Sequence, residues 1–181
     1  MARGGTRALD ELERAGVPHA IHEYDLHEPS RADRGRRPAW GDDAAAALGV
    51  DPARIHKTLI ASVDGRLAVA VVPVAAELDL KALAGALGGR KAEMADPAEA
   101  ERATGYVRGG ISPLGQRRRL PTVLDAASLA SETVFVSAGR RGLQVELAPA
   151  DLVRASGAIT APIARHASAG PDTVSPPRAP R

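Results

Sequence analysis

Hydrophobic positions recur along residues 6–165 with the periods of short helices and short strands. The most regular helical pattern follows Asp79, because Leu80, Leu83, Ala84 and Leu87 fall at i, i+3, i+4 and i+7. Similar patterns, bounded by capping residues and glycines, predict further helices over 7–15, 44–48, 97–104 and 149–156. The expected N-caps of the first three of these are Thr6, Asp42 or Asp43, and Asp96.

The clearest strand pair comprises residues 56–63 and 66–74, joined by Asp64-Gly65, a dipeptide typical of type I′ hairpin turns. Residues 67–72 are apolar on both faces, which predicts a central strand. Further strands are expected at 19–24, 91–94, 121–124, 133–137 and 143–147. Because these elements follow no strict βαβ order, we predict a single α+β domain with a mixed, mostly antiparallel sheet or barrel of about seven strands.

Composition narrows the possible functions. The 181 residues carry a net charge of +2 and include no cysteine, which excludes disulfides, thiolate metal sites and a cysteine nucleophile. No apolar run approaches the ~20 residues that span a bilayer, and the N-terminus lacks a secretory signal, so a cytoplasmic protein without a membrane partner is expected. With one Phe, one Trp and two Tyr, aromatic stacking is not the expected route to nucleic acid.

The domain is expected to span residues 6–165. Residues 1–5 and 166–181 are expected to be disordered ends, the second because it consists of small and polar residues and four prolines. Residues 27–40 contain two prolines, four arginines and a glycine, which indicates a flexible basic insertion. The sequence leaves two alternatives open: the insertion contacts RNA, or it is a purely solvated loop.

Residues 105–115, called the glycine loop below, cannot form the interior of a helix or a central strand, because glycine and proline interrupt them repeatedly. Exposed backbone N–H groups beside cations suit an oxygen-rich, partly anionic ligand, whereas a long structural turn is the simpler alternative. The cations beside the loop are Arg117, Arg118 and Arg119, and Arg140 and Arg141 form a separate basic cluster. These arginines are candidate phosphate contacts or, alternatively, solubilising residues.

The first strand of the hairpin places Lys57 on one face with Leu59, Ala61 and Val63. Its ammonium group either reaches water along its stem or lies in a cleft and binds an anionic or carbonyl oxygen. The histidines lack metal-ligand spacing, so each is expected to be satisfied within the fold or solvated, and no metal or cofactor is expected.

Five groups of residues occur in the order found in a known family. They are Thr6-Arg7-Ala8-Leu9 with Tyr24, His56-Lys57-Thr58-Leu59, Glu93-Met94-Ala95-Asp96-Pro97, Thr104-Gly105-Tyr106 with Gly109-Gly110-Ile111-Ser112-Pro113-Leu114-Gly115, and Val136-Ser137 with Arg141-Gly142-Leu143. On these residues the chain resembles the YbaK/EbsC family of aminoacyl-tRNA deacylases, relatives of the editing domain in bacterial prolyl-tRNA synthetases. The nearest branch resembles the Cys-tRNA(Pro) deacylases, and the resemblance covers residues 6 to about 165.

The resemblance implies hydrolysis of the ester between a wrong amino acid and the terminal adenosine of a tRNA. Lys57 would hold the adenosine, and the backbone amides of a bend from Gly109 to Pro113 would stabilise the developing negative charge. The implied catalytic residues are Lys57, Gly109, Gly110 and Ser112. The implied substrate-binding residues are Tyr24, Thr58, Ile111, Pro113, Ser137, Gln144 and Glu146.

In the Cys-specific branch the thiol of the substrate is thought to attack its own carbonyl, so the protein would contribute only positioning and oxyanion stabilisation. That branch carries Asp where this chain has Gln144, and Glu146 on the same strand face is a possible replacement. The expected partners are tRNA(Pro) and prolyl-tRNA synthetase, while the oligomeric state is undetermined. Deacylation of another small aminoacyl-tRNA, such as alanyl-tRNA, and a non-catalytic binding module are the alternatives.

Overall fold

The computed structural model describes residues 5–25 and 40–166. Within them the helices are α1 (Arg7–Arg14), α2 (Trp40–Leu48), α3 (Leu80–Ala86), α4 (Pro97–Thr104), the 3-10 helix η2 (Ala126–Ala130) and α5 (Pro149–Ser156). The strands are β1 (Ala20–Glu23), β2 (His56–Val63), β3 (Arg66–Pro73), β4 (Ala76–Leu78), β5 (Ala92–Met94), β6 (Thr122–Asp125), β7 (Val134–Ser137), β8 (Leu143–Leu147), β9 (Ile159–Ala161) and β10 (Ala164–His166). The predicted basic insertion at 27–40 and the predicted disordered ends lie almost entirely outside the described residues.

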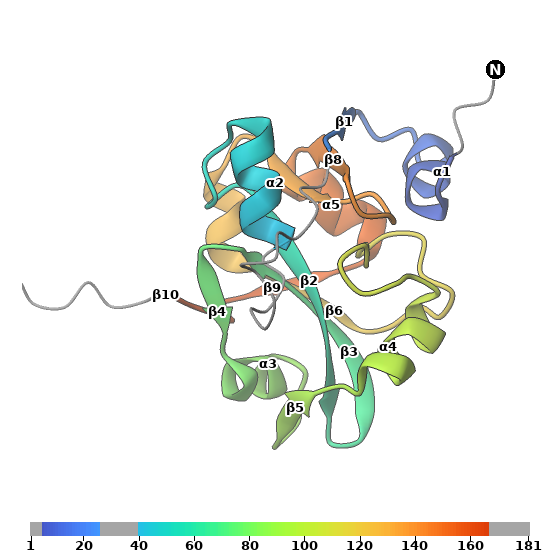
Figure 1. Cartoon of the computed structure of the whole chain (residues 1–181). Helices are drawn as coiled ribbons and strands as arrows, with labels where there is room; N and C mark the ends of the chain where they lie inside the picture. Colours follow the sequence, from blue (N-terminus) through green and yellow to red (C-terminus); the bar gives the residue numbers. More distant parts are fainter. Residues whose placement is uncertain (1–4, 26–39, 167–181) are drawn as a thin grey trace, which may run out of the picture.

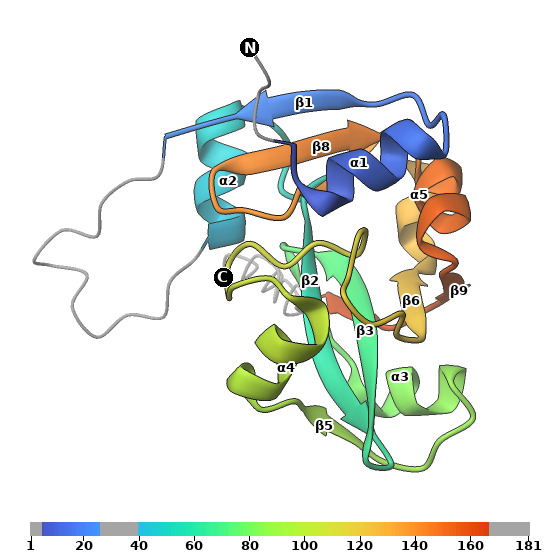
Figure 2. The ribbon, with the colours of Figure 1, turned by 90° about the vertical axis from the view of Figure 1, so that its right-hand side faces the viewer.

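The strands form three sheets rather than one. A five-stranded sheet has the order β5-β2-β3-β6-β9, a three-stranded sheet has the order β1-β8-β7, and β10 pairs with β4 (Figures 1 and 2). In the large sheet β3 runs antiparallel to β2 and parallel to β6, so the sheet is mixed. The predicted α+β class with a mixed sheet is therefore confirmed.

The hairpin of β2 and β3 forms the centre of the fold. Val63 pairs with Arg66 across a turn in which Asp64 and Gly65 both have positive φ, at 48° and 79°, as a type I′ turn requires. Both faces of β3 are buried, with Val69 and Val71 in the largest hydrophobic cluster and Ala68 and Val72 in a second one. The prediction of a central strand is confirmed, because apolar side chains on both faces pack against separate layers.

Two predictions about local elements need correction. Helix α2 begins at Trp40, so Asp42 and Asp43 lie within its first turn and neither is its N-cap. Strands β4, β9 and β10 were not predicted, because each has only three residues and no clear alternation. They form by pairing with segments distant in sequence, such as β9 with β6 and β10 with β4.

The small sheet joins the large one at the start of β2. Ile55 forms a parallel bridge with Phe135 of β7, and the Phe135 amide donates to the Arg54 carbonyl at 2.9 Å. Phe135 lies in a third hydrophobic cluster with Ile55 and with Ala44 and Ala45 of α2. This junction brings the β7–β8 hairpin beside the strand that carries Lys57 and Thr58.

Candidate functional site at the glycine loop

The glycine loop is closed at its base by backbone hydrogen bonds. Helix α4 ends at Gly105, whose φ of 73° is left-handed, and beyond the loop the Arg117 amide donates to the Thr104 carbonyl at 2.9 Å. Across the loop, the Tyr106 hydroxyl donates to the Leu114 carbonyl at 2.8 Å. Figures 1 and 2 both place this loop beside the first half of β2.

The amides of residues 109–115 divide into two groups. Those of Gly110, Leu114 and Gly115 donate within the protein, to the Val107 carbonyl, the Ser112 hydroxyl and the Glu11 carboxylate respectively. Those of Gly109, Ile111 and Ser112 donate to no described residue. Gly110 was expected to offer its amide to substrate, but this amide donates to the Val107 carbonyl at 2.9 Å.

Gly110 brings the loop into contact with the β7–β8 turn. A Cβ atom at this position would lie 3.0 Å from the backbone Cα and C of Arg140 and from the backbone N of Arg141. The Arg141 Nε also donates to the Arg108 carbonyl at 2.8 Å. Glycine lets the two backbones approach closely here, so the loop and the hairpin are in direct contact.

Three of the predicted substrate-binding residues gather at this end of the small sheet. Ser137 of β7 pairs with Gln144 of β8, next to the turn that contacts Gly110. The Tyr24 amide donates to the Gly142 carbonyl at 3.0 Å, which places Tyr24 directly after β1 at the same turn. The fold therefore brings together residues separated by more than a hundred positions in sequence.

Two buried polar side-chain atoms, one on β2 and one on β8, lack a hydrogen-bond partner among the described residues. Among the described residues, the Thr58 Oγ1 and the Gln144 Oε1 are the buried side-chain oxygen or nitrogen atoms without a hydrogen bond. An unsatisfied buried polar group costs about 1–3 kcal/mol, and it is typical of a site that a ligand or water completes. Both residues were predicted from the sequence to bind substrate.

Lys57 is half-buried near the start of β2, one residue before Thr58. Strand alternation places Lys57 on the face of Ala61, whose cluster includes α3, and Thr58 on the face of Ile60, whose cluster includes the loop residue Leu114. Thr58 is therefore the residue on the loop side of the strand. The Lys57 ammonium reaches that side only if its stem passes the strand edge, which a long lysine side chain permits.

Ser112 has a structural position inside the loop. Its side chain is fully buried, its hydroxyl accepts from the Leu114 amide at 3.2 Å, and its carbonyl accepts from the Gln116 side chain at 2.9 Å. Pro113 is also buried, and Ile111 packs partly against the main cluster. These contacts shape the bend.

Glu146 is held by other residues rather than directed at the Gln144 side chain. Its carboxylate accepts from Thr133 at 2.5 Å and from His22 and Arg54 at 2.9 Å each. The Thr133 hydroxyl is the main reason that the pKa of Glu146 lies below its usual value, followed by the contact with His22. Replacement of the missing aspartate by Glu146 would break this cluster, so the structure argues against it.

Of the histidines whose side chains the structure describes, His19, His22 and His56 each have a hydrogen-bond partner within the fold, as predicted. His56 is buried, with its Nε2 2.6 Å from the Ser128 Oγ and its Nδ1 3.0 Å from the Arg54 carbonyl. Burial lowers the pKa of His56 to about 4, so its ring is neutral at pH 7. Sequence reasoning did not find Ser128, because it lies 72 residues away and belongs to no motif.

The described part of the chain contains neither a cluster of metal-ligating side chains nor a membrane-spanning helix. No group of three His, Cys, Asp or Glu side chains there is arranged to hold a metal ion. Likewise, none of the helices in residues 5–25 and 40–166 is long and apolar enough to cross a bilayer.

The predicted phosphate contacts are all exposed. Arg117, Arg118 and Arg119 follow the loop, and the β7–β8 turn carries Arg140, which pairs with Glu23, and Arg141. Two surface cavities border the ends of the loop, one lined by Gly105, Val107 and Arg117 and the other by Gly115, Gln116 and Arg119. Lys57 lines neither of these cavities.

The fold and the glycine loop define a class of protein, and this class is represented among known families. A family model described as an aminoacyl-tRNA editing domain matches residues 39–155. The chain belongs to this family, as the motifs predicted. It is 38% identical over 152 residues to "Putative Cys-tRNA(Pro)/Cys-tRNA(Cys) deacylase EbsC" of Enterococcus faecalis (strain ATCC 700802 / V583), with 80% of this chain and 84% of the relative covered.

Solved structures share the fold over nearly the whole chain. One is titled "Crystal structure of a putative trans-editing enzyme for prolyl tRNA synthetase" and has a TM-score of 0.76 at 23% identity, covering 91% of this chain and 99% of the other. A second, of hypothetical protein APE2540, has a TM-score of 0.75 at 25% identity, covering 88% of this chain and all of the other. The predicted fold is thus confirmed.

Proposed function

We propose that the chain deacylates Cys-tRNA(Pro), cleaving the ester between cysteine and the 3′-terminal adenosine. The family and the EbsC relative support this class of reaction. The single observation that carries the proposal is the pair of unsatisfied buried oxygens of Thr58 and Gln144 beside the glycine loop. A polar substrate in this place would satisfy both groups and would meet the loop amides that donate to no described residue.

The residues have distinct roles in this proposal. The amides of Gly109 and Ile111 orient the aminoacyl carbonyl and stabilise its oxyanion, which is the usual role of preorganised backbone donors. Thr58, Ser137 and Tyr24 bind the ribose or the aminoacyl group. Lys57 holds the terminal nucleotide by its phosphate or ribose oxygens, since an ammonium group is a compact point charge with mobile donors.

The proposed chemistry uses the substrate as its own nucleophile. The cysteinyl sulfur, as thiolate, attacks its carbonyl carbon, the bond to the tRNA oxygen breaks, and that oxygen takes up the thiol proton. The resulting thiolactone then adds water and opens to free cysteine. Correct orientation of two reacting groups supplies about 7–11 kcal/mol in favourable intramolecular cases, so positioning suffices without a protein nucleophile.

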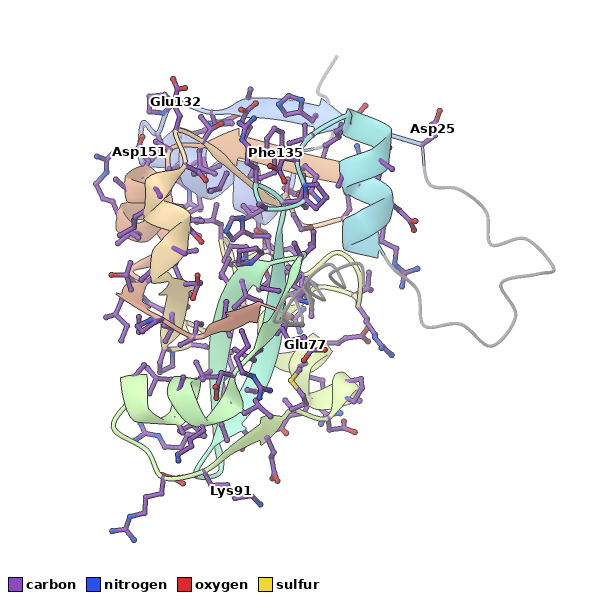
Figure 3. All side chains as sticks on the ribbon, turned by 90° about the vertical axis from the view of Figure 1, so that its left-hand side faces the viewer. Asp25, Glu77, Lys91, Glu132, Phe135 and Asp151 are labelled. Carbon is purple, nitrogen blue, oxygen red and sulfur yellow. The ribbon has the colours of Figure 1, made fainter. Side chains whose placement is uncertain are left out.

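A deacylation assay with cysteine-, serine- and alanine-charged tRNA(Pro) tests the proposal. Wild type is expected to release cysteine much faster than serine, because serine lacks the thiol, and Lys57→Ala is expected to abolish most of the release. Lys91→Ala is the matched control, because Lys91 is exposed and lies at the far end of the molecule from Phe135 (Figure 3). Equal rates with cysteine and serine would contradict thiol assistance.

One observation favours a second substrate. Gln144 is buried and uncharged where the Cys-specific branch has aspartate, so a small apolar aminoacyl group such as alanine is the alternative. Faster loss of alanine than of cysteine would support it. If wild type leaves every ester intact at the rate of buffer, the chain is a binding module, and recruitment to tRNA(Pro) through prolyl-tRNA synthetase becomes the function to measure.

A further inference from the structure

Helix α1 contacts both ends of the glycine loop. At the entrance, the Arg7 guanidinium donates from Nη2 to the carbonyls of Thr104 and Gly105, at 3.1 and 2.8 Å. At the exit, the Glu11 carboxylate accepts from the Gly115 amide. Arg7 and Glu11 are four residues apart, so they lie on one face of the helix.

Glycines allow the helix to approach this closely. A Cβ atom at Gly115 would lie 2.4 Å from the backbone C and O of Arg7, and one at Gly105 would lie 2.5 Å from the Arg7 Nη2. Both glycines also have positive φ, at 63° and 73°. The contact is therefore built into the backbone of the loop and does not depend on two surface side chains alone.

The side chain of Tyr106 completes the connection. Its ring stacks under the Arg7 guanidinium, with the Arg7 Cζ 4.7 Å from the ring centroid, and its hydroxyl crosses the loop to the Leu114 carbonyl. Burial raises the pKa of Tyr106 to about 12, so the hydroxyl stays a donor at every physiological pH. Thr6, which caps α1, donates to the Ala138 carbonyl and so links the same helix to the β7–β8 hairpin.

We infer that α1 is a clamp that fixes the glycine loop, with Arg7 and Glu11 as positioning residues for deacylation. The helix lies outside the matched family region, which begins at residue 39, so the match assigns it no role. Fixing both ends of a short loop restricts where its free amides point. Small displacements of such donors greatly reduce the stabilisation that they give to an oxyanion. The kinetic part of this inference rests on the proposed function, whereas the mechanical part does not.

The test compares Arg7→Met with Arg14→Met. Methionine keeps an unbranched stem over Tyr106 but removes the donors to Thr104 and Gly105, whereas Arg14 is exposed on the last turn of the same helix. Two quantities are measured on each folded protein: amide hydrogen exchange along the chain, and kcat and KM for cysteine release from Cys-tRNA(Pro). Far-UV circular dichroism at the assay temperature confirms that each variant is folded.

For Arg7→Met we expect faster exchange confined to residues 105–115 and a kcat lower by roughly 10- to 100-fold. Arg14→Met should leave both unchanged, and Arg7→Lys should recover part of the rate, because one ammonium can reach one carbonyl. A purely structural role would instead accelerate exchange in β2 and β3 as well. If Arg7→Met does not fold, Glu11→Gln weakens the other end of the clamp without changing shape.

Unchanged exchange in residues 105–115 of folded Arg7→Met would overturn the clamp. Changed exchange with an unchanged kcat would overturn its role in positioning. Failure of the proposed function is a different result, because wild type would then release no amino acid while the exchange comparison would still decide whether α1 holds the loop.

Discussion

Thr58 and Thr122 are two threonines of the large sheet whose hydroxyl groups are buried, but only one hydroxyl has a partner. The Thr122 hydroxyl donates to the Leu120 carbonyl at 3.0 Å, whereas the Thr58 hydroxyl has no partner among the described residues. Replacement by valine keeps the shape and removes the hydroxyl in both cases. Opposite effects on stability are therefore expected from the same chemical change.

We expect Thr58→Val to raise the free energy of unfolding by about 1 kcal/mol and Thr122→Val to lower it by about 1 kcal/mol. Thr58→Val should at the same time reduce kcat/KM for deacylation, because functional sites often retain groups that stability disfavours. Urea denaturation measures the stability difference. An equal loss of stability in both variants would show that Thr58 has a structural partner and does not await a substrate.

His56 makes the stability of the protein depend on pH. Burial holds its pKa at about 4 in the folded state, below the 6.5 of the unfolded chain. Between these values only the unfolded state binds the proton, so stability falls as pH falls from 6.5 towards 4, by about 3 kcal/mol in total. Carboxylates such as Glu146, whose pKa is lowered from 4.5, add to this loss only at the acidic end.

Urea denaturation at pH 7 and pH 5 checks this expectation. Wild type should lose stability over that interval, and His56→Gln should show a much flatter dependence even if it is less stable at pH 7. His19→Gln is the control, since His19 is only half-buried. A flat profile in wild type would mean that the His56 ring is protonated within the fold.

From the sequence we predicted a set of site residues, and their part in binding substrate stays a prediction. The motifs pointed to Thr58, Ser137 and Gln144, which the fold brings to the glycine loop. They did not reveal that Glu146 is held by Thr133, His22 and Arg54, because those partners come from three other segments. Contacts between distant segments leave no period or spacing in the chain.

At the scale of elements, most local signals were reliable, the N-cap of α2 being an exception, whereas long-range pairing was not predicted. The β2–β3 hairpin and the caps of α3 and α4 depend on neighbouring residues, and each forms where predicted. Strands β9 and β10 depend on β6 and β4, so their existence follows from tertiary packing. The separation into three sheets has the same origin.

Contact between the glycine loop and the β7–β8 turn should be sensitive to one methyl group. Gly110→Ala would place Cβ 3.0 Å from the Arg140 backbone, whereas a Cβ at Gly85 of α3 has no atom within 4 Å. We expect Gly110→Ala to cost about 1–3 kcal/mol of stability and to lower kcat by roughly tenfold or more. Gly85→Ala should raise stability by about 0.5–1 kcal/mol and leave kcat unchanged.

Thermal melts and the deacylation assay measure both effects. A Gly110→Ala protein as active as wild type would show that loop and turn can separate without consequence for catalysis. Activity loss in Gly85→Ala as well would attribute the effect to general changes in the protein rather than to this contact.

At the scale of the whole molecule, the net charge of +2 conceals an uneven distribution. Three exposed arginines follow the glycine loop, at positions 117, 118 and 119. Two more, Arg140 and Arg141, lie on the turn beside it. A tRNA whose terminal adenosine lies at the loop would carry its phosphates past these groups. Local cations of this kind attract nucleic acid without requiring a strongly basic protein.

The salt dependence of tRNA binding distinguishes arginines that contact phosphates from arginines that only keep the protein in solution. For each phosphate that an arginine no longer neutralises, the slope of log K against log salt should fall by about 0.7 for single strands and about 0.9 for duplex. Glutamine at positions 117, 118 and 119 should therefore weaken binding of tRNA(Pro) and flatten its salt response. Glutamine at Arg66 and Arg90, which are exposed near the β2–β3 turn away from the loop, should do neither. If both sets of variants change the slope equally, the attraction arises from overall charge, and the arginines beside the loop do not guide the acceptor end of the tRNA.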